Sequence, residues 1–226
     1  MEGRGPVFAL VEPEVRDAHE RHDQRHHDYR VADLFVPARR ACWFSQEPVQ
    51  PGPLYALPAV ALFAAMIACV PLGIARHALD GFKELAGVKK PVRTETLLRD
   101  KPVAQAELGQ AEGLLRAGRA FLYATVEQAW DVAQRGRRLS WEERGLLWLA
   151  ATQAAAQAAQ AVDLVFRAGG ASSVYATAPL ERCLRDLRTA AQHICVTSTN
   201  YEVAGRLFLG LGLEGTIWGI DSRGDA

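Results

Sequence analysis

The chain has 226 residues, with 26 lysine and arginine residues against 26 aspartate and glutamate residues, so its formal net charge is zero. This balance argues against a dedicated nucleic-acid-binding protein, which normally carries a basic excess. Apolar residues make up 49% and charged residues 23% of the chain, which is ordinary for globular proteins and excludes wholesale disorder. The four cysteines form no C-x-x-C pair and no secretory signal opens the sequence, so we expect a cytoplasmic protein with free thiols.

The amino-terminal part of the chain has a different character. The stretch from Glu12 to Arg30 holds ten charged residues and four histidines in nineteen positions, with no apolar periodicity. Such a composition predicts a solvated segment, so residues 1–28 are expected to be disordered. The histidine spacing is loose and the neighbouring charges alternate without pattern, and we therefore expect no metal site there.

Residues 29–52 contain one short apolar run followed by a proline-rich loop. Val31 to Val36 carries the run, and Pro37 ends it because proline cannot continue a hydrogen-bonded ladder. This pattern predicts a single β-strand. The strand has no sheet in this chain to join, which suggests that the sequence begins in the middle of a larger unit.

From residue 53 onward the signals are helical. Apolar residues recur at steps of three and four, Ser140 and Glu143 form a capping box, and Pro179 suits the first turn of a helix. Short links join the predicted helices, so we predict an all-α, up-and-down four-helix bundle over residues 53–215 and a tail over 216–226. The expected helices run from Leu57 to Leu85, Val103 to Gln134, Ser140 to Arg167, and Pro179 past Ala204 with a break allowed around Val196–Asn200.

One uncharged stretch is long enough to cross a membrane. Leu54 to Ala75 contains no charged residue. However, Pro58 and Pro71 bracket only twelve residues, and the stretch is rich in alanine, which contributes little insertion energy. Residues 76–85 continue at helical spacing with their charges on one side. These features favour a buried helix of a soluble bundle, and no membrane association is expected.

A second helical stretch has unusually small side chains. Ala150 to Val162 is nearly all alanine and glutamine. Because small residues allow helices to approach closely, this stretch is expected either deep in the bundle or at a contact between subunits.

Three segments are candidates for a site. Gly210 to Gly215 matches G-x-G-x-x-G, but a long helix precedes it and only eleven residues follow, so it is interpreted as a helix end. Gly169 and Gly170 lie between two helices, where free backbone amides can receive a phosphate or a ring carbonyl, with a simple connection as the alternative. His193 has apolar neighbours, and it is either a satisfied core histidine or a functional one.

The segments around Gly169–Gly170 and His193, together with four further motifs, resemble the acyl-CoA dehydrogenase superfamily. The resemblance is to its carboxy-terminal helical bundle, in the branch of monooxygenases that use reduced flavin from a separate reductase. The order and spacing of the motifs carry it over about residues 28–212, and the strand ending at Pro37 would be the last strand of a β-domain, with residues 29–52 as its remnant. The motifs are Val31–Pro37, Pro53–Pro58, Leu72–Asp80, Ala168–Gly170, Pro179–Asp186 and Ala191–His193.

The resemblance also implies site residues. In the family a glycine turn approaches the flavin of a neighbouring subunit, which points here to Ala168 and the two glycines that follow it. An arginine after the first bundle helix contacts the cofactor, with Arg93 as the first candidate and Arg99 as the second. The monooxygenase branch carries a histidine where dehydrogenases often carry a catalytic glutamate. His193 is therefore the candidate that orients or deprotonates an aromatic substrate.

The implied activity is oxygen insertion into an aromatic or heterocyclic small molecule, with reduced FMN or FAD as the cofactor. A flavin reductase and a homo-oligomer, usually a tetramer, are the implied partners. Family members also carry an N-terminal helical domain and a full β-domain, and their absence suggests a truncated gene, a misplaced start or a frameshift. The alternatives are a non-catalytic bundle that only oligomerises, and an acyl-CoA dehydrogenase proper, which would need a carboxylate base elsewhere.

Overall fold

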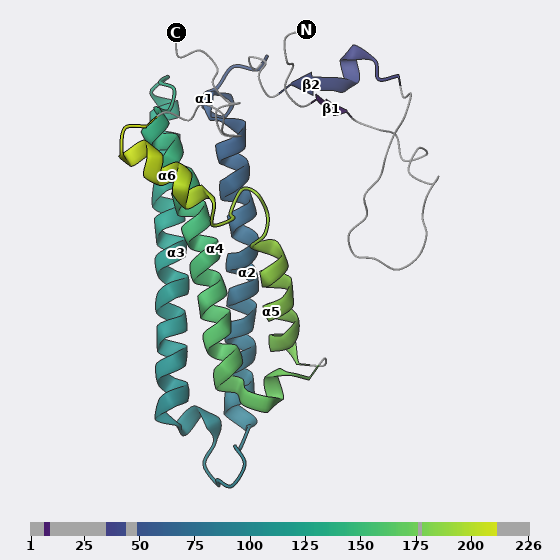
Figure 1. The fold of residues 1–226 in the computed structure, drawn as a ribbon, viewed down its shortest axis with the longest axis vertical. Coiled ribbons are helices and arrows are strands. Elements are labelled where there is room, and N and C mark those ends of the chain that lie inside the picture. The colour runs from purple at the N-terminus through teal and green to yellow at the C-terminus, as the bar shows by residue number, and fades with distance from the viewer. Residues whose placement is uncertain (1–6, 10–34, 44–48, 176–177, 212–226) are drawn as a thin grey trace.

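The fold is built from helices along most of the chain. A computed structural model describes residues 7–9, 35–43, 49–175 and 178–211 (Figure 1). The all-helical class predicted for residues from 53 onward is confirmed within this part. The helices are α1 (Pro53–Ala56), α2 (Ala59–Val88), η4 (Leu98–Asp100), α3 (Pro102–Gln134), α4 (Trp141–Gly169), η5 (Gly170–Ser173), α5 (Pro179–Ala190) and α6 (Asn200–Phe208).

Helix α4 is the centre of the bundle. It packs against α2, α3, α5 and α6. Figure 1 shows α2, α3 and α4 as long neighbouring columns, with α5 alongside α2 and α6 crossing α4 near the end where α4 begins. The alanine-rich stretch of α4 is buried at this centre, including Ala150, Ala154 and Ala158. Of the two predicted locations for that stretch, the interior of the bundle is the one observed.

Local signals set the helix boundaries, and three of them are present in the structure. Ser140 accepts the backbone N–H of Glu143, and the Glu143 carboxylate accepts the N–H of Ser140, so the capping box begins α4. Gly136 follows α3 with a φ of 72°, a conformation that glycine adopts without strain. Pro179 occupies the first turn of α5, where its missing N–H leaves no bond unmade.

The fourth predicted helix is two helices. Helix α5 ends at Ala190 and α6 begins at Asn200, so the break starts five residues earlier than the predicted start at Val196. Within the break the N–H groups of Val196 and Thr197 both bond to the carbonyl of His193, and the chain continues as successive turns. Polar residues of this segment compete for backbone groups, which is why helical periodicity alone extended the helix too far.

The strand prediction is wrong for its described part. Phe35 to Pro37 have no regular structure, while Val31 and Leu34 lie outside the described residues. After a short turn η3 (Ala38–Arg40), strand β2 (Ala41–Trp43) pairs antiparallel with β1 (Val7–Ala9). A strand of this region therefore has a partner within the chain, contrary to the prediction. The pairing joins residues more than thirty positions apart, which a local apolar pattern cannot reveal.

Strand β1 also lies inside the segment predicted to be disordered. Its three residues, Val7–Ala9, form regular structure, and the rest of residues 1–28 lies outside the described residues. The domain boundaries at 28, 52 and 215 remain predictions.

Helix α2 is the only helix among the described residues that is long and apolar enough to span a membrane. It packs on α4, α5 and α3 with an alanine-rich face, and 39% of its most apolar window is buried there. Pro71, expected to limit the apolar stretch, lies inside the continuous helix and is buried. The packing supports the interpretation as a bundle helix. The opposite face of α2 leaves Met66 and Val70 more than half exposed.

Candidate functional site

His193 lies in the turn segment between α5 and α6. Its side chain is exposed, whereas Cys195 and Val196 beside it are buried and anchor the turn to the bundle. The backbone N–H of Cys195 donates a hydrogen bond to Nδ1 of His193 over 3.2 Å. The structure therefore places His193 at the surface, and the alternative of a satisfied core histidine is wrong.

A buried polar contact holds this turn against α4. The amide Nδ2 of Asn200 donates to Oγ1 of Thr152 on α4 and to the carbonyl of Ile194, each over 3.2 Å. Asn200 and Thr152 are both 1% exposed. Next to them, the hydroxyl of Tyr201 donates to Oε1 of Gln153 over 2.8 Å. The residue after His193 is thus tied to the central helix of the bundle. Sequence reasoning missed Asn200, which looked like part of a loop.

The Gly169–Gly170 turn ends α4. It precedes α5 in the chain, whereas the turn with His193 follows α5. Gly169 is buried, and a Cβ there would collide with Oγ of Ser173 and come within 3.2 Å of Leu180 Cδ1. Gly170 is exposed and has φ 59° and ψ −149°, a combination open mainly to glycine. The first glycine is therefore required by packing and the second by its backbone conformation. Ala168, before them, is half-buried against the core.

Lys89 connects this turn to the loop that follows α2. Its ammonium group donates to the carbonyl of Gly169, one of the carbonyls left free at the end of α4. A cation at a helix C-terminus is also favoured by the helix dipole. The loop from Lys89 is closed by the N–H of Leu98, which bonds to the carbonyl of Lys89 over 2.8 Å. The two predicted cofactor-binding regions are thus in contact through Lys89.

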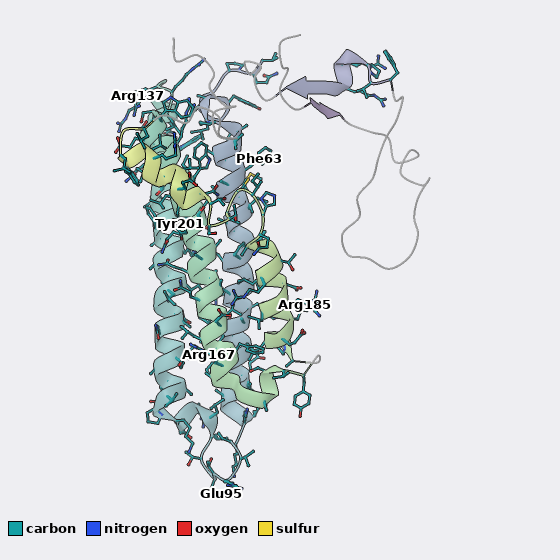
Figure 2. All side chains as sticks on the ribbon, viewed as in Figure 1. Phe63, Glu95, Arg137, Arg167, Arg185 and Tyr201 are labelled. Atoms are coloured by element: carbon teal, nitrogen blue, oxygen red, sulfur yellow. The ribbon has the colours of Figure 1, made fainter. Side chains whose placement is uncertain are left out.

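Arg93 is at the tip of that loop. It is exposed and has a φ of 63°, the only positive φ of a non-glycine residue among the described ones. Such a conformation costs on the order of 1 kcal/mol and is concentrated at functional positions. Arg99, in η4, is also exposed, with its Nε 3.9 Å from Asp100. Figure 2 shows Glu95 of the same loop and Arg167 of α4 toward this end of the molecule, and Tyr201 toward the other.

The predicted catalytic and cofactor-binding residues do not form one cluster in this chain. Helix α5 lies between the glycine turn and His193 (Figure 1). Its twelve residues correspond to a length of about 18 Å. The structure brings Ala168, Gly169 and Gly170 together with the Arg93 loop and leaves His193 apart. A cofactor that contacts both parts would have to extend over this distance, or it would have to lie between two copies of the chain, each of which supplies one part.

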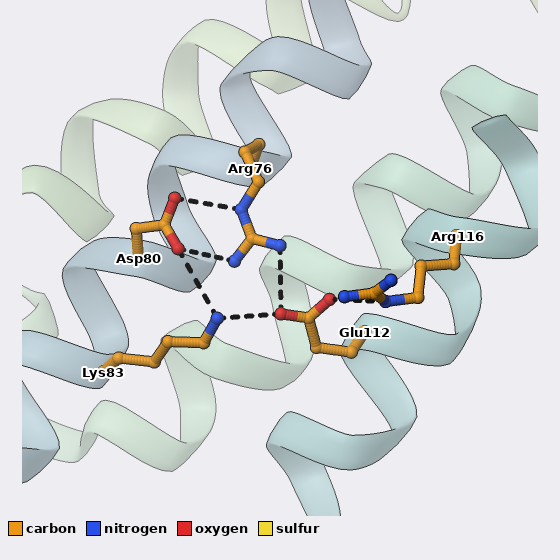
Figure 3. A network of polar contacts seen from close by, with 5 residues as sticks. All are labelled: Arg76, Asp80, Lys83, Glu112 and Arg116. Atoms are coloured by element: carbon orange, nitrogen blue, oxygen red, sulfur yellow. Dashed lines mark hydrogen bonds and ion pairs between the residues drawn. The ribbon is translucent and has the colours of Figure 1, made fainter.

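A network of ion pairs connects α2 and α3, and Figure 3 shows its geometry. Arg76 donates from Nη2 and Nε to both carboxylate oxygens of Asp80 over 2.7 and 2.9 Å. Glu112 on α3 accepts from Arg76 over 2.9 Å, from Lys83 over 2.8 Å and from Arg116 over 3.2 Å. The hydrogen bond from Lys83, followed by that from Arg76, lowers the pKa of Glu112 to about 2.

The network borders a groove between α2 and α3 with a volume of about 410 Å³. The residues that line it include Leu72 and Leu115 and three arginines, Arg76, Arg116 and Arg119. None of the predicted site residues lines this groove. The spacing of four residues between Arg76 and Asp80 indicates an ion pair on one helix face. The hydrogen bonds to Glu112, in contrast, depend on how α2 and α3 pack.

The buried cysteines have no chemical role in these contacts. Burial raises the pKa of both Cys183 and Cys195, so each thiol stays protonated at neutral pH. They act as small apolar side chains in the core.

Comparison with known proteins identifies the class to which this bundle belongs. Residues 65–198 match the model of the acyl-CoA dehydrogenase C-terminal domain, which is more than half of the chain. The chain therefore belongs to the acyl-CoA dehydrogenase family through this C-terminal domain. The match runs from within α2 to the turn that carries His193, and it confirms the family expected from the sequence.

The similar curated proteins are monooxygenases and hydroxylases. An indole-3-acetate monooxygenase from Pseudomonas putida is 32% identical over 81% of this chain and 47% of its own length. A pigment production hydroxylase from Rhodococcus erythropolis is 28% identical over 73% of this chain and 42% of its own length. The chain thus spans about half the length of the curated relatives that it matches.

Solved structures share the fold. XiaF from Streptomyces sp., solved in complex with FADH2 and glycerol, superposes with a TM-score of 0.72 at 26% identity, over 80% of this chain and 48% of that chain. The 3-HSA hydroxylase from Rhodococcus sp. RHA1 has the same TM-score at 24% identity, over 80% and 49% of the two chains. At this identity, the likeness to the 3-HSA hydroxylase shows a shared fold alone.

Proposed function

We propose that this chain is the C-terminal, helical part of a reduced-flavin-dependent monooxygenase that acts on an aromatic or heterocyclic small molecule. The observation that carries the proposal is the 32% identity to an indole-3-acetate monooxygenase over 81% of the chain. The likeness to XiaF, whose structure holds FADH2, supports reduced flavin as the cofactor. A separate flavin reductase, a homotetramer and a cytoplasmic location complete the proposal.

The residues at the Gly169–Gly170 turn fit a phosphate-bearing cofactor. Gly170 is exposed and has no side chain to separate a ligand from the backbone, and Lys89 and Arg93 supply positive charge on the adjoining loop. Lys89 would hold the turn in shape, and Arg93 would bind the anionic end of the flavin. The bound flavin would supply the oxygen chemistry, while the protein positions the substrate and excludes water.

His193 is the residue that we propose to contact the substrate. It is exposed beside Ile194, whose apolar side chain is 49% exposed and suits contact with a ring. The acyl-CoA dehydrogenase alternative is less well supported, because residues 191–199 contain no carboxylate that could abstract a proton.

A non-catalytic bundle that only oligomerises is the second candidate. It is favoured by the exposed apolar face of α2. Its distinguishing feature would be self-association without any flavin binding.

Anaerobic titration of the purified chain with FMN and FAD, each oxidised and dithionite-reduced, tests the proposal. We expect saturable binding of reduced flavin and a tetramer mass in solution. Arg93→Gln should weaken this binding about tenfold, the equivalent of one charge-assisted hydrogen bond. Arg99→Gln, at the second candidate on the same connection, is the comparison variant: weaker binding by Arg99→Gln and not by Arg93→Gln would assign the cofactor contact to Arg99. Absence of reduced-flavin binding would favour the oligomerisation bundle.

Oxygen consumption in the presence of reduced flavin and aromatic substrates tests the role of His193. His193→Ala should lower the coupled hydroxylation by about 10²-fold or more, because the loss of one positioned hydrogen-bond donor to a reacting oxygen costs this order of magnitude. Flavin binding should stay unchanged, since His193 lies about the length of α5 away from the glycine turn. Equal hydroxylation by parent and variant would exclude His193 from the site.

A further inference from the structure

The hydrogen bond at Nδ1 of His193 determines which form of the imidazole the turn can hold. The partner is a backbone N–H, that of Cys195, and an N–H can only donate. Nδ1 must therefore present its lone pair, and the proton of a neutral imidazole must be on Nε2. The imidazolium, which carries protons on both nitrogens, could not accept this bond. The other neutral tautomer could not accept it either.

Nε2 is the free end of the ring. Among the described residues, no hydrogen bond is made to Nε2, and the side chain is exposed to solvent. With Nδ1 engaged, the ring offers a ligand one N–H donor and no lone pair. In this geometry His193 can donate a hydrogen bond to a substrate oxygen, but it cannot receive a proton from one at Nε2.

The backbone N–H that sets the tautomer is itself held in place. Cys195 follows Ile194, whose carbonyl accepts from Asn200, and Asn200 also donates to Thr152 on the central helix α4. Cys195 is buried on the core side of the same turn. Two contacts thus hold the Cys195 N–H in position. The side chain of Cys195 is buried, and the amide of Asn200 bonds to the Ile194 carbonyl, which belongs to the same peptide group as this N–H.

We propose that Asn200 is a positioning residue that holds His193 as a hydrogen-bond donor through Nε2–H. The ligand that this donor suits is an aromatic molecule with an oxygen acceptor, such as a phenolate, carboxylate or carbonyl group, whose ring lies on Ile194. No proton is transferred: the substrate oxygen is oriented, and negative charge on it is stabilised. This role toward substrate rests on the proposed function, whereas the tautomer and the part played by Asn200 do not.

Nitrogen-15 NMR of the full chain, recorded in alkaline buffer, tests the proposal directly. Long-range proton–nitrogen correlations distinguish a protonated ring nitrogen from one with a free lone pair. The His193 signals are identified by their loss in His193→Gln. We expect a protonated Nε2 and an unprotonated Nδ1. The opposite tautomer, or an even mixture of the two, would overturn the proposal.

Two buried substitutions separate positioning from general stability. Asn200→Leu keeps the volume of the side chain but removes both hydrogen bonds, and it should shift the His193 nitrogens toward the average of a mobile ring. Asn200→Ser, which is too short to reach both acceptors, should do the same and serves if the leucine variant does not fold. Thr152→Val is the matched control, because it removes one bond of Asn200 and leaves the bond to Ile194. Unchanged His193 signals in both Asn200 variants would overturn the positioning role.

The substrate role has a separate measurement in the assay with reduced flavin. His193→Gln carries an amide N–H near the position of Nε2 and should retain about a tenth or more of the parent activity, well above His193→Ala. Equal loss in both variants would contradict a donor role. A parent chain with the expected tautomer but no hydroxylation would contradict the proposed function alone, so the two failures can be told apart.

Discussion

At the scale of single residues, charge pairs on α2 and α3 make the molecule sensitive to acid. Glu112 has a pKa of about 2, well below its ordinary value of 4.5, because Lys83 and Arg76 hydrogen-bond to its ionised form. A lowered carboxyl pKa contributes stability above the unfolded-state pKa, and this contribution is lost as the pH falls through the folded-state value. The bundle should therefore lose stability between about pH 5 and about pH 2.

Glu112→Gln tests this dependence. We expect the free energy of unfolding at neutral pH to fall by about 1–2 kcal/mol, a figure discounted for the partly exposed partners, and the slope below about pH 5 to decrease. Urea denaturation at a series of pH values measures both. Glu95→Gln is the control: Glu95 pairs with Lys90, but its side chain is 96% exposed. A similar loss of stability in the two variants would show that the packing of α2 on α3 does not strengthen the ion pairs of Glu112.

At the scale of the helices, the contact of α3 with α4 depends on small residues. A Cβ on Gly118 would lie 3.1 Å from the Cα of Ala154 and 2.8 Å from Oε1 of Gln157. The obstructing atom of Ala154 belongs to the backbone and cannot move without shifting the helix. Gly113, on the same helix, has no atom within 4 Å of the position that a Cβ would take.

Alanine at these two positions should have opposite effects. Gly118→Ala is expected to lower the free energy of unfolding by about 1–3 kcal/mol, because it forces α3 and α4 apart. Gly113→Ala should raise it by about 0.5–1 kcal/mol, because alanine is the better helix former. Thermal unfolding of the two variants beside the parent measures the difference. If both substitutions raised the free energy of unfolding, α3 and α4 would be able to accommodate a methyl group at residue 118 without a loss of stability.

At the scale of the whole molecule, α2 presents an apolar face that the described bundle does not cover. Phe63, Met66 and Val70 recur at helical spacing and are 42%, 63% and 51% exposed. Figure 2 shows Phe63 on the part of α2 nearer to α1. Contiguous exposed apolar surface of this kind marks a contact with another protein surface. It is the face that we expect to be covered in the proposed homo-oligomer.

Met66→Glu should weaken that association. A charge in an apolar interface is left without its hydration, so we expect the mass in solution, measured by light scattering, to shift toward the monomer. Val92→Glu makes the same change at a residue that is 89% exposed in the loop after α2, outside this face. It should leave the mass unchanged. An assembly that survives Met66→Glu would place the subunit contact elsewhere.

The sequence by itself determined the family, the helical class and most helix boundaries. Those boundaries follow from interactions within a few residues, such as the Ser140–Glu143 capping box and the left-handed Gly136, and such signals can be read in chain order. It also indicated the glycine turn and His193, because their motif order is that of the family.

Only the tertiary structure decided what joins residues far apart in the chain. The pairing of β1 with β2, the contact of Lys89 with Gly169 and the bond from Asn200 to Thr152 have no local signature. For the same reason the lowered pKa of Glu112, and the contact of Asn200 with α4 that holds the turn of His193, could not be predicted from sequence. Each depends on one atom meeting another at hydrogen-bond distance, and the packing of helices around α4 determines which atoms meet.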